Sequence, residues 1–171
     1  MKLDETIKIL KTFAKNVVTL AKKNAKKHKA SGQLIRSIGY DYKTMPNSFS
    51  LEFFMNGYGQ FVDAGVDGKE TKYGKRKYGL ETYSFKSKMP PPKKLDKWVV
   101  RKGIAPRDAK GRFQNRQSLT FAIARSIFKK GFKPSYFFSG AFEQAYKKMP
   151  QEFIDKYELD IDNFLKFTLK S

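Results

Sequence analysis

Residues 48–65 read Ser-Phe-Ser-Leu-Glu-Phe-Phe-Met-Asn-Gly-Tyr-Gly-Gln-Phe-Val-Asp-Ala-Gly, and this stretch decides the fold. Over 49–55, large apolar residues recur at every second position, which is the period of a strand with one buried face. The turn signal Pro46-Asn47-Ser48 precedes it, so residues 37–56 predict a β-hairpin. The glycine-rich residues that follow predict a short helix or tight connection closed by Gly65.

The sequence on either side of the hairpin is helical. Over residues 4–28, apolar residues recur at alternating intervals of four and three, the stripe of an amphipathic helix: Leu3, Ile7, Leu10, Ala14, Val17 and Ala21. Further helices are predicted at 118–130, from about 135 to 148, and over 151–169. We therefore expect an α+β fold, in which a long N-terminal helix and C-terminal helices pack on a small antiparallel sheet.

The middle of the chain has a different character. Residues 66–116 contain 16 Lys and Arg against 5 Asp and Glu, with scattered glycines and the run Pro90-Pro91-Pro92. A long basic loop or β-arm is predicted here, with a strand near 82–85 and a short helix over 93–102. We expect one domain spanning 1–171, with 66–116 as a basic insertion or arm and 150–171 as a C-terminal helical extension.

Charge is the strongest compositional signal, because 36 Lys and Arg face 16 Asp and Glu, a formal net charge of +20 on 171 residues. Such an excess attracts polyanions or acidic protein surfaces. Two groups of cations are the predicted polyanion or partner contacts: Lys22, Lys23, Lys26 and Lys27 at the end of the first helix, and Arg107, Lys110 and Arg112 in a basic loop. A solvated helix end explains the first group equally well.

The composition argues against an enzyme. The chain has no cysteine and a single histidine, His28, which excludes thiolate catalysis and Cys- or His-pair metal sites. A nuclease could recruit Glu52, Asp63 and Lys69, but their spacing matches no nuclease motif. We expect no catalytic, cofactor-binding or metal-binding residues.

The sequence also bears on location. No apolar run is long enough to span a membrane, and the N-terminus lacks a signal peptide, which predicts synthesis in the cytoplasm.

Three segments together resemble a known family. They are Ala-Ser-Gly-Gln-Leu-Ile-Arg-Ser-Ile at 30–38, Tyr-Gly-Gln-Phe-Val-Asp-Ala-Gly at 58–65, and Lys-Gly-Phe-Lys-Pro-Ser-Tyr-Phe-Phe-Ser-Gly-Ala-Phe at 130–142. Their order and spacing resemble the tail-completion and head–tail-joining family of long-tailed bacteriophages. Asp63 stands where that family usually has Glu, and 66–116 is longer than the usual connection.

The resemblance implies a structural virion protein, made in the bacterial host cytoplasm and located at the neck. Copies would form a homo-oligomeric ring at the portal–tail junction, contact portal or other neck and tail proteins, and surround the channel for genomic DNA. Aromatic residues of the arm would then be subunit-interface anchors: Tyr73, Tyr78, Tyr83 and Phe85. A floppy insertion is the plain alternative for the arm. The alternative function is a nucleic-acid-binding accessory protein acting through a basic surface.

Overall fold

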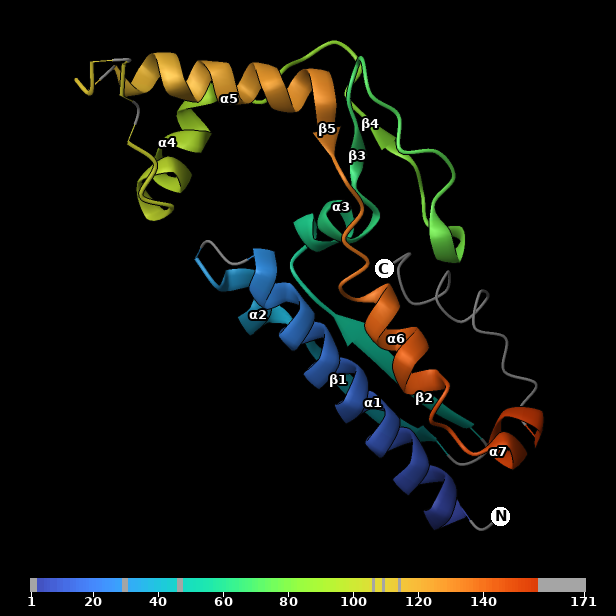
Figure 1. The fold of residues 1–171 in the computed structure, drawn as a ribbon. Helices are drawn as coiled ribbons and strands as arrows, with labels where there is room; N and C mark the ends of the chain where they lie inside the picture. Colours follow the sequence, from blue (N-terminus) through green and yellow to red (C-terminus); the bar gives the residue numbers. More distant parts are fainter. Residues whose placement is uncertain are drawn as a thin grey trace. The chain divides into compact units, whose positions relative to one another are not determined.

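A computed structural model of the chain describes residues 3–28, 31–45, 48–105, 107–108, 110–113 and 115–156 (Figure 1). By its internal contacts the chain divides into two compact units. Unit 1 consists of residues 1–63, 77–80 and 135–171, and unit 2 consists of residues 64–76 and 81–134. The chain therefore leaves unit 1, returns to it briefly at 77–80, and returns finally at Ser135.

Unit 1 is a helical layer on a two-stranded sheet. Its elements are α1 (Leu3–Ala25), the 3-10 turn η1 (Lys26–His28), α2 (Gln33–Ser37), β1 (Gly39–Met45), β2 (Ser48–Phe54), α3 (Tyr58–Ala64), the turn η2 (Lys77–Gly79), α6 (Ser139–Tyr146) and α7 (Gln151–Lys156). Figure 1 shows α1 and α6 side by side against the β1–β2 hairpin. The strands pair antiparallel, with Tyr40 opposite Phe53 and Asp41 opposite Glu52.

The core of unit 1 is aromatic. The rings of Phe13, Phe53, Phe138 and Phe142 meet edge to face, with centroids 5.1–6.2 Å apart. Edge-to-face pairs add favourable electrostatics to the burial of large apolar surface. Alanines of α1 and α6 let the two helices approach this cluster closely: Ala14, Ala21, Ala25, Ala141 and Ala145 are all buried.

Unit 2 has a three-stranded sheet and a helical hairpin. Its elements are β3 (Val66–Asp67), β4 (Tyr83–Ser84), α4 (Pro92–Arg101), α5 (Arg116–Lys130) and β5 (Gly131–Phe132). The strand order is β4-β3-β5, parallel on the β4 side and antiparallel on the β5 side. Val99 of α4 and Ala124 of α5 are buried where these two helices pack.

Glycine is required where α5 passes into the sheet of unit 2. Gly131 has a φ of 66°, and a Cβ there would overlap the carbonyl oxygen of Val66. Gly68 on the facing segment would likewise overlap the backbone of Lys129. Because these backbones approach so closely, any side chain at either position would separate β3 from β5.

The predicted α+β class, with its long N-terminal helix, small sheet and C-terminal helices, is confirmed. The first helix, the hairpin, the helix at 58–64 and the helix at 92–101 lie where the sequence places them. The description of 66–92 as a loop with a strand near 82–85 missed β3, which is the centre of the sheet in unit 2. The predicted helix over 151–169 begins as α7, and its residues beyond 156 lie outside the described part of the chain.

Two predicted helix starts are wrong. The helix predicted at 118–130 begins at Arg116, and its cap is Asn115, whose side chain accepts a hydrogen bond from the N–H of Gln117 at 2.8 Å. The helix expected to open at Ser135 or Tyr136 begins at Ser139. Tyr136 has a φ of 48°, a left-handed conformation that a helix start does not adopt.

The single-domain organisation, with 66–116 as an insertion and 150–171 as an extension, stays a prediction. Unit 2 takes in all of 66–116 except 77–80, and it also includes α5 and β5. The basic insertion of the sequence therefore corresponds to most, but not all, of one structural unit.

Candidate interaction surface

The three segments that carry the family resemblance meet in unit 1. The side chain of Leu34 lies against Gly59, and Ser37 Oγ accepts a hydrogen bond from the N–H of Asn56 at 2.9 Å. The first of these contacts joins the first segment to the second, and the other ties the first segment to Asn56, which lies just before the second. Ser135 Oγ donates to the carbonyl oxygen of Val62 at 2.7 Å and so begins the junction of the second segment with the third.

Asp63 completes that junction. Its side chain is buried and accepts hydrogen bonds from the N–H groups of Phe138, at 2.8 Å, and Ser139, at the start of α6. Burial raises the pKa of this carboxyl group above its ordinary value, and the hydrogen bonds to the backbone oppose that rise. Asp63 thus caps α6 from a distant segment. This fixes the two points, at 63 and 135, where the chain leaves and re-enters unit 1.

The turn at 77–80 is held to unit 1 by polar contacts. Tyr78 OH donates to Glu143 Oε2 at 2.6 Å, and the N–H of Lys77 donates to Tyr136 OH at 3.2 Å. The rings of Tyr78 and Tyr136 meet edge to face at 5.7 Å. Burial, then the hydrogen bond to Glu143, raises the pKa of Tyr78 far above its ordinary value, so this phenol stays protonated.

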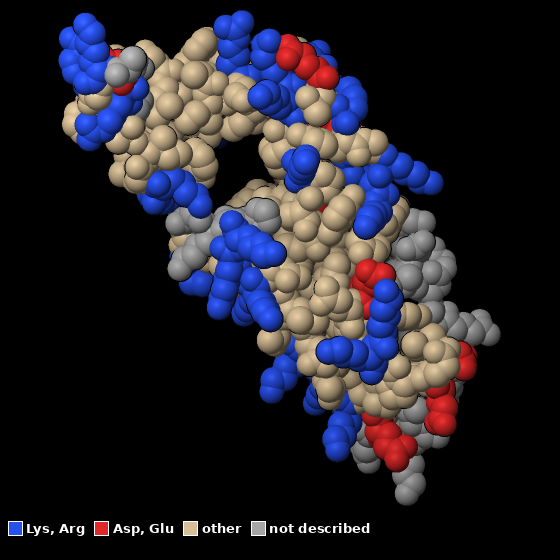
Figure 2. Space-filling view, viewed as in Figure 1, with Lys and Arg blue, Asp and Glu red and all other residues tan. Residues whose placement is uncertain are grey.

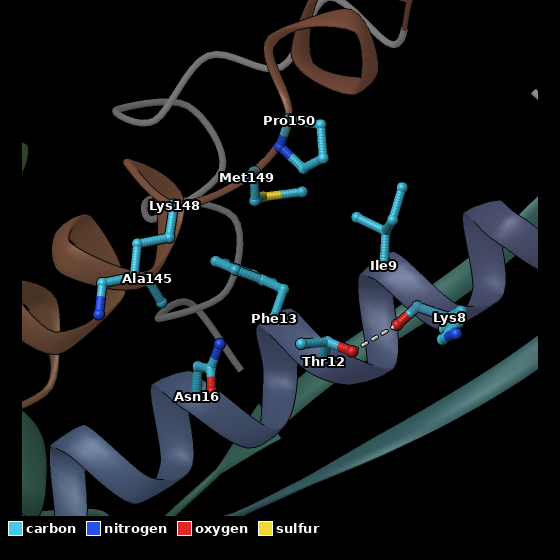
Figure 3. A pocket seen from close by; sticks show the side chains of 9 residues that line it. All are labelled: Lys8, Ile9, Thr12, Phe13, Asn16, Ala145, Lys148, Met149 and Pro150. Carbon is cyan, nitrogen blue, oxygen red and sulfur yellow. Dashed lines mark hydrogen bonds between the residues drawn. The ribbon is translucent and has the colours of Figure 1, made fainter.

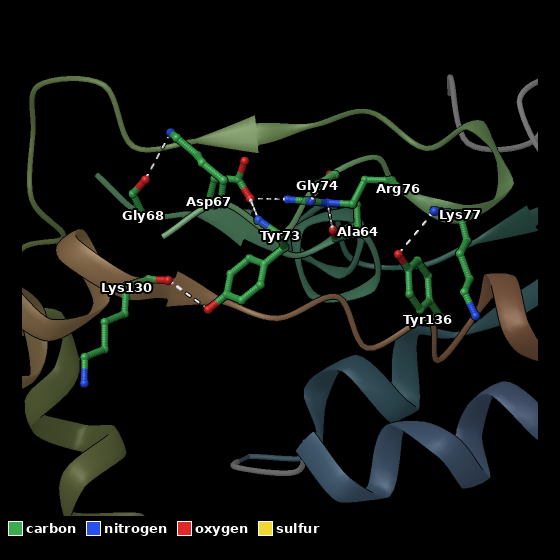
Figure 4. A network of polar contacts seen from close by, with 10 residues as sticks. Ala64, Asp67, Gly68, Tyr73, Gly74, Arg76, Lys77, Lys130 and Tyr136 are labelled. Carbon is green, nitrogen blue, oxygen red and sulfur yellow. Dashed lines mark hydrogen bonds and ion pairs between the residues drawn. The ribbon is translucent and has the colours of Figure 1, made fainter. Parts of the chain in front are cut away.

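Unit 2 is organised around a buried ion pair, shown in Figure 4. Arg76 Nη2 lies 2.7 Å from Asp67 Oδ1, and Arg76 Nε donates to the carbonyl oxygen of Ala64 at 2.6 Å. The N–H of Tyr73 also donates to Asp67 Oδ1 at 3.0 Å. Burial of Asp67 would raise its pKa, but the hydrogen bond from Arg76, the N–H of Tyr73 and the nearby positive charges lower it overall.

The four aromatic residues predicted as interface anchors are all half-buried and contact their own units. Tyr73 OH donates to the carbonyl oxygen of Lys130 at 2.8 Å, and Phe85 packs on Phe128 at 6.1 Å. Tyr78 is held by Glu143, as described above, and Tyr83 belongs to β4. Their role at a subunit interface stays a prediction.

The exposed aromatic surface lies elsewhere, on residues that the sequence analysis did not single out. In unit 1 these are Phe54, Tyr58 and Phe61; in unit 2 they are Phe113, Phe121 and Phe132, joined by Val100 and Ile104. Phe113 is 71% exposed and stacks under the guanidinium of Arg107 at 4.1 Å. The alternation in β2 offered one usable signal, because it puts Phe54 on the face opposite to Phe53.

The cations predicted as contact residues are surface residues. Lys22 and Lys23 lie in the last turn of α1, and Lys26 and Lys27 follow in η1. All of them except the half-buried Lys22 are exposed. In the basic loop, Arg107 donates to the carbonyl oxygen of Gly111 at 2.9 Å, and Arg112 pairs with Asp108 at 2.9 Å. Lys110 is exposed beside them, so the loop presents its cations in an ordered turn.

Unit 2 carries most of the positive charge. Its sequence contains 19 Lys and Arg against 5 Asp and Glu, a net +14, whereas unit 1 contains 17 against 11. Four of the five acidic residues each pair with a different cation: Asp67 with Arg76, Glu70 with Lys129, Asp96 with Arg116, and Asp108 with Arg112. Few carboxylates are left to neutralise the excess, which must attract counterions or an acidic partner.

The helix α4 concentrates this excess in a stripe. Lys93, Lys97 and Arg101 are spaced by four residues, so they share one face of the helix, and all three are exposed. Like charges at this spacing destabilise an isolated helix, and an anionic partner would relieve that repulsion. Figure 2 shows Lys and Arg side chains over α4 and α5, with a few Asp and Glu side chains among them.

A shallow groove lies on the surface of each unit. In unit 1 a space of about 300 Å³ lies between α1 and the end of α6, with Phe13, Ile9 and Met149 around it (Figure 3). In unit 2 a wider space of about 1050 Å³, the α4–α5 groove, is lined by residues of α4 and of the start of α5, namely Pro92, Lys93, Asp96, Asn115, Arg116, Gln117, Ser118, Thr120 and Phe121. Both are open surface features.

Catalytic and metal-binding arrangements were also sought. Within the described ranges, no group of three or more His, Asp or Glu side chains could hold a metal ion. In that same part of the chain, no helix is both long and apolar enough to cross a membrane.

Comparison of the chain with protein-family models, with curated proteins and with solved structures returned no match.

Proposed function

We propose that this protein is a structural component of a tailed-phage virion, which forms a ring at the portal–tail junction around the DNA channel. The observation that carries the proposal is the difference in core and charge between the two units. One is an α+β unit with a dense aromatic core, and the other is a strongly cationic unit with exposed aromatic residues. Such a cationic unit suits contact with acidic neighbours or with DNA.

The contacts among the three resembling segments support the same proposal. A chance likeness would scatter residues 30–38, 58–65 and 130–142 over the molecule. Instead, Leu34 lies against Gly59, and Asp63 caps the helix that the third segment opens. Parts of the three segments therefore pack together within unit 1.

The proposal assigns no catalytic step to the protein. Joining would come from shape, from apolar contact and from charge, with the Lys and Arg excess steering the protein to its neighbours. The proposed location is the neck of the virion, after synthesis in the host cytoplasm. The proposed partners are further copies of the chain, the portal or other neck and tail proteins, and the DNA within the channel.

The test is the mass of the purified protein in solution. Light scattering at moderate salt, with and without the portal complex of the same phage, separates the two functions considered above. A discrete ring that forms or is stabilised with the portal supports the junction role. A monomer that ignores the portal but binds DNA, with affinity falling steeply as salt rises, would replace it by the nucleic-acid-binding role.

A deletion tests the contribution of unit 2. The segment 77–80 belongs to unit 1, so removing all of 66–92 would damage both units. Replacing residues 88–127 by a short Gly/Ser linker keeps Tyr78 and the strands of unit 2 while removing α4 and most of α5. We expect the variant to keep the unfolding transition of unit 1 and to fail in virion assembly. Normal assembly with this variant would contradict a joining role for unit 2.

A further inference from the structure

In the described part of unit 1, side chains on the outer face of the β1–β2 hairpin are exposed, and we call this surface the open face. Phe53, Leu51 and Tyr40 pack against the core, so the pleat turns the alternate residues to the other side. That second face carries Asp41 and Lys43 of β1 and Ser50, Glu52 and Phe54 of β2. Phe54 is 55% exposed, and its ring lies across the backbone of Gly39, its partner in the register.

The open face carries more acidic than basic groups, although the chain as a whole is strongly basic. Asp41 and Glu52 lie directly opposite each other across the two strands. Like charges in that position destabilise a sheet, and Lys43, 3.8 Å from Asp41, offsets them only in part. Residues 39–65 as a whole have a net charge of −2 in a chain of +20. The open face therefore combines an exposed aromatic ring with carboxylates, and a basic apolar surface would complement it.

The α4–α5 groove of unit 2 has those properties. Phe121, 51% exposed, and Pro92 supply apolar walls. Lys93 and Arg116 supply positive charge; Asp96, paired with Arg116 at 3.4 Å, also faces the groove. Lys94 and Lys97 on the same helix extend the positive surface beyond its edge. With a volume of about 1050 Å³, the groove has room for an aromatic side chain and its neighbours.

We propose that the open face of β1–β2 in one copy docks into the α4–α5 groove of a second copy. Phe54 would contact Phe121 and Pro92, and Glu52 and Asp41 would face Lys93 and Arg116. The occupant is another copy of this chain because both surfaces, apolar and opposite in charge, are present in it. The inference rests on the proposed function in one respect: it names the contact from which the ring would be built.

The contact joins two different surfaces, so it is heterologous. Each copy offers one open face and one groove, and every copy can therefore bind two neighbours in a head-to-tail series. Such a series closes into a ring when the rotation between copies allows it. A contact of Phe54 with Phe54 would instead produce a two-fold dimer and stop there.

Single-cysteine variants test the contact directly, because the natural chain contains no cysteine. Phe54→Cys and Phe121→Cys proteins are mixed at high concentration and oxidised, and disulfide-linked dimers are measured on a non-reducing gel. Only intermolecular pairing can link two different variants. We expect the mixture to give several-fold more dimer than either variant alone. Thr19→Cys, exposed on α1, replaces Phe54→Cys as the matched control.

Charge reversal provides the second readout. Glu52→Lys and Lys93→Glu should each weaken self-association about tenfold, since each puts like charges together. The double variant restores an opposite pair and should recover most of the affinity. Both residues are exposed, so the variants are expected to fold, which circular dichroism checks.

Dimer yield no higher than that of the Thr19→Cys control would overturn the proposal. So would a Phe54→Cys protein that links to itself as well as to Phe121→Cys, because the contact would then be symmetric. Additive losses in the double charge variant would also overturn it. These experiments use the purified protein alone, so their failure leaves the portal-binding test of the proposed function to be decided separately.

Discussion

Unit 1 and unit 2 are stabilised in different ways. Unit 1 buries a continuous set of phenylalanines and alanines between two helices and a hairpin. The buried hydrophobic residues of unit 2 are few and small: Ala64, Val66, Val99 and Ala124. It depends instead on close backbone packing at Gly68 and Gly131 and on the ion pair of Asp67 with Arg76. The difference indicates that unit 1 has the larger apolar contribution to stability, while unit 2 carries most of the net positive charge.

The core of unit 1 should show the largest effect. Phe142→Ala removes a fully buried ring that lies 5.1 Å from Phe13 and 6.0 Å from Phe53. We expect a loss of about 4 kcal/mol in the free energy of unfolding, because the cavity cannot close among rigid rings. Urea unfolding followed by circular dichroism measures it. A loss below about 1 kcal/mol would contradict the assignment of stability to this cluster.

The ion pair of unit 2 should show the next largest effect. Asp67→Asn leaves Arg76 charged, buried and without its carboxylate, which should cost about 3 kcal/mol. Arg76→Lys, which keeps the charge but loses the guanidinium hydrogen bonds to Ala64 and Gly74, is the matched comparison. Amide hydrogen exchange resolves the two units, and the increase in exchange should be confined to unit 2.

The same pair makes unit 2 sensitive to acid. The pKa of Asp67 is lowered in the folded state from its ordinary 3.8. The unfolded state therefore binds a proton more readily, and the stabilisation is complete above that ordinary value. It is lost as the pH falls below about 4 towards the lowered folded value. Hydrogen exchange in unit 2 should rise over that range, and Asp67→Asn should lose this part of the pH dependence.

Charge reversal compares the basic surfaces of the two units. Replacing Lys93, Lys94, Lys97 and Arg101 of α4 by Glu should weaken binding to a DNA duplex or an acidic partner more than the same change at Lys22, Lys23, Lys26 and Lys27. Each lost phosphate contact lowers the slope of log affinity against log salt by about 1. Fluorescence anisotropy at several salt concentrations gives both slopes. An equal loss from the two surfaces would show that unit 2 has no special role in binding.

The smallest effect on stability is expected at the exposed aromatics. Phe121→Ala should change the free energy of unfolding by less than about 0.5 kcal/mol, since half of the side chain is already in solvent. Its effect should appear in self-association instead, measured by analytical ultracentrifugation. A large loss of stability with unchanged association would show that Phe121 stabilises unit 2 and does not take part in self-association.

The parts of this structure that follow local periodicity were predictable. The spacing of apolar residues in α1 and the alternation in β2 each specify an element and its buried face. The parts set by distant residues were not. Asp63 caps α6 from a segment more than seventy residues away, so the start of that helix carries no local signal. The two-residue strand β3 is too short to show any period, and backbone contacts with Tyr83 and Phe132 create it.

The candidate surface was predicted in its charge but not in its aromatic residues. Lysine and arginine are exposed almost wherever they occur, so the exposure of Lys26 and Arg107 was predictable, while their role as contact residues stays a prediction. Aromatic residues are buried or exposed according to packing that the sequence does not reveal. Tyr78 is held by Glu143, whereas Phe121 remains exposed, and nothing in their immediate neighbours distinguishes these outcomes.

The return of the chain to unit 1 at Ser135 has a consequence for biosynthesis. Phe137, Phe138 and Phe142 complete the aromatic core, and a ribosome adds them only after every residue of unit 2 has been made. A nascent chain that ends before them therefore leaves Phe13 and Phe53 without their main partners. Prematurely terminated products would lack a folded unit 1 and would be open to proteolysis, so only chains that reach α6 would persist as folded protein.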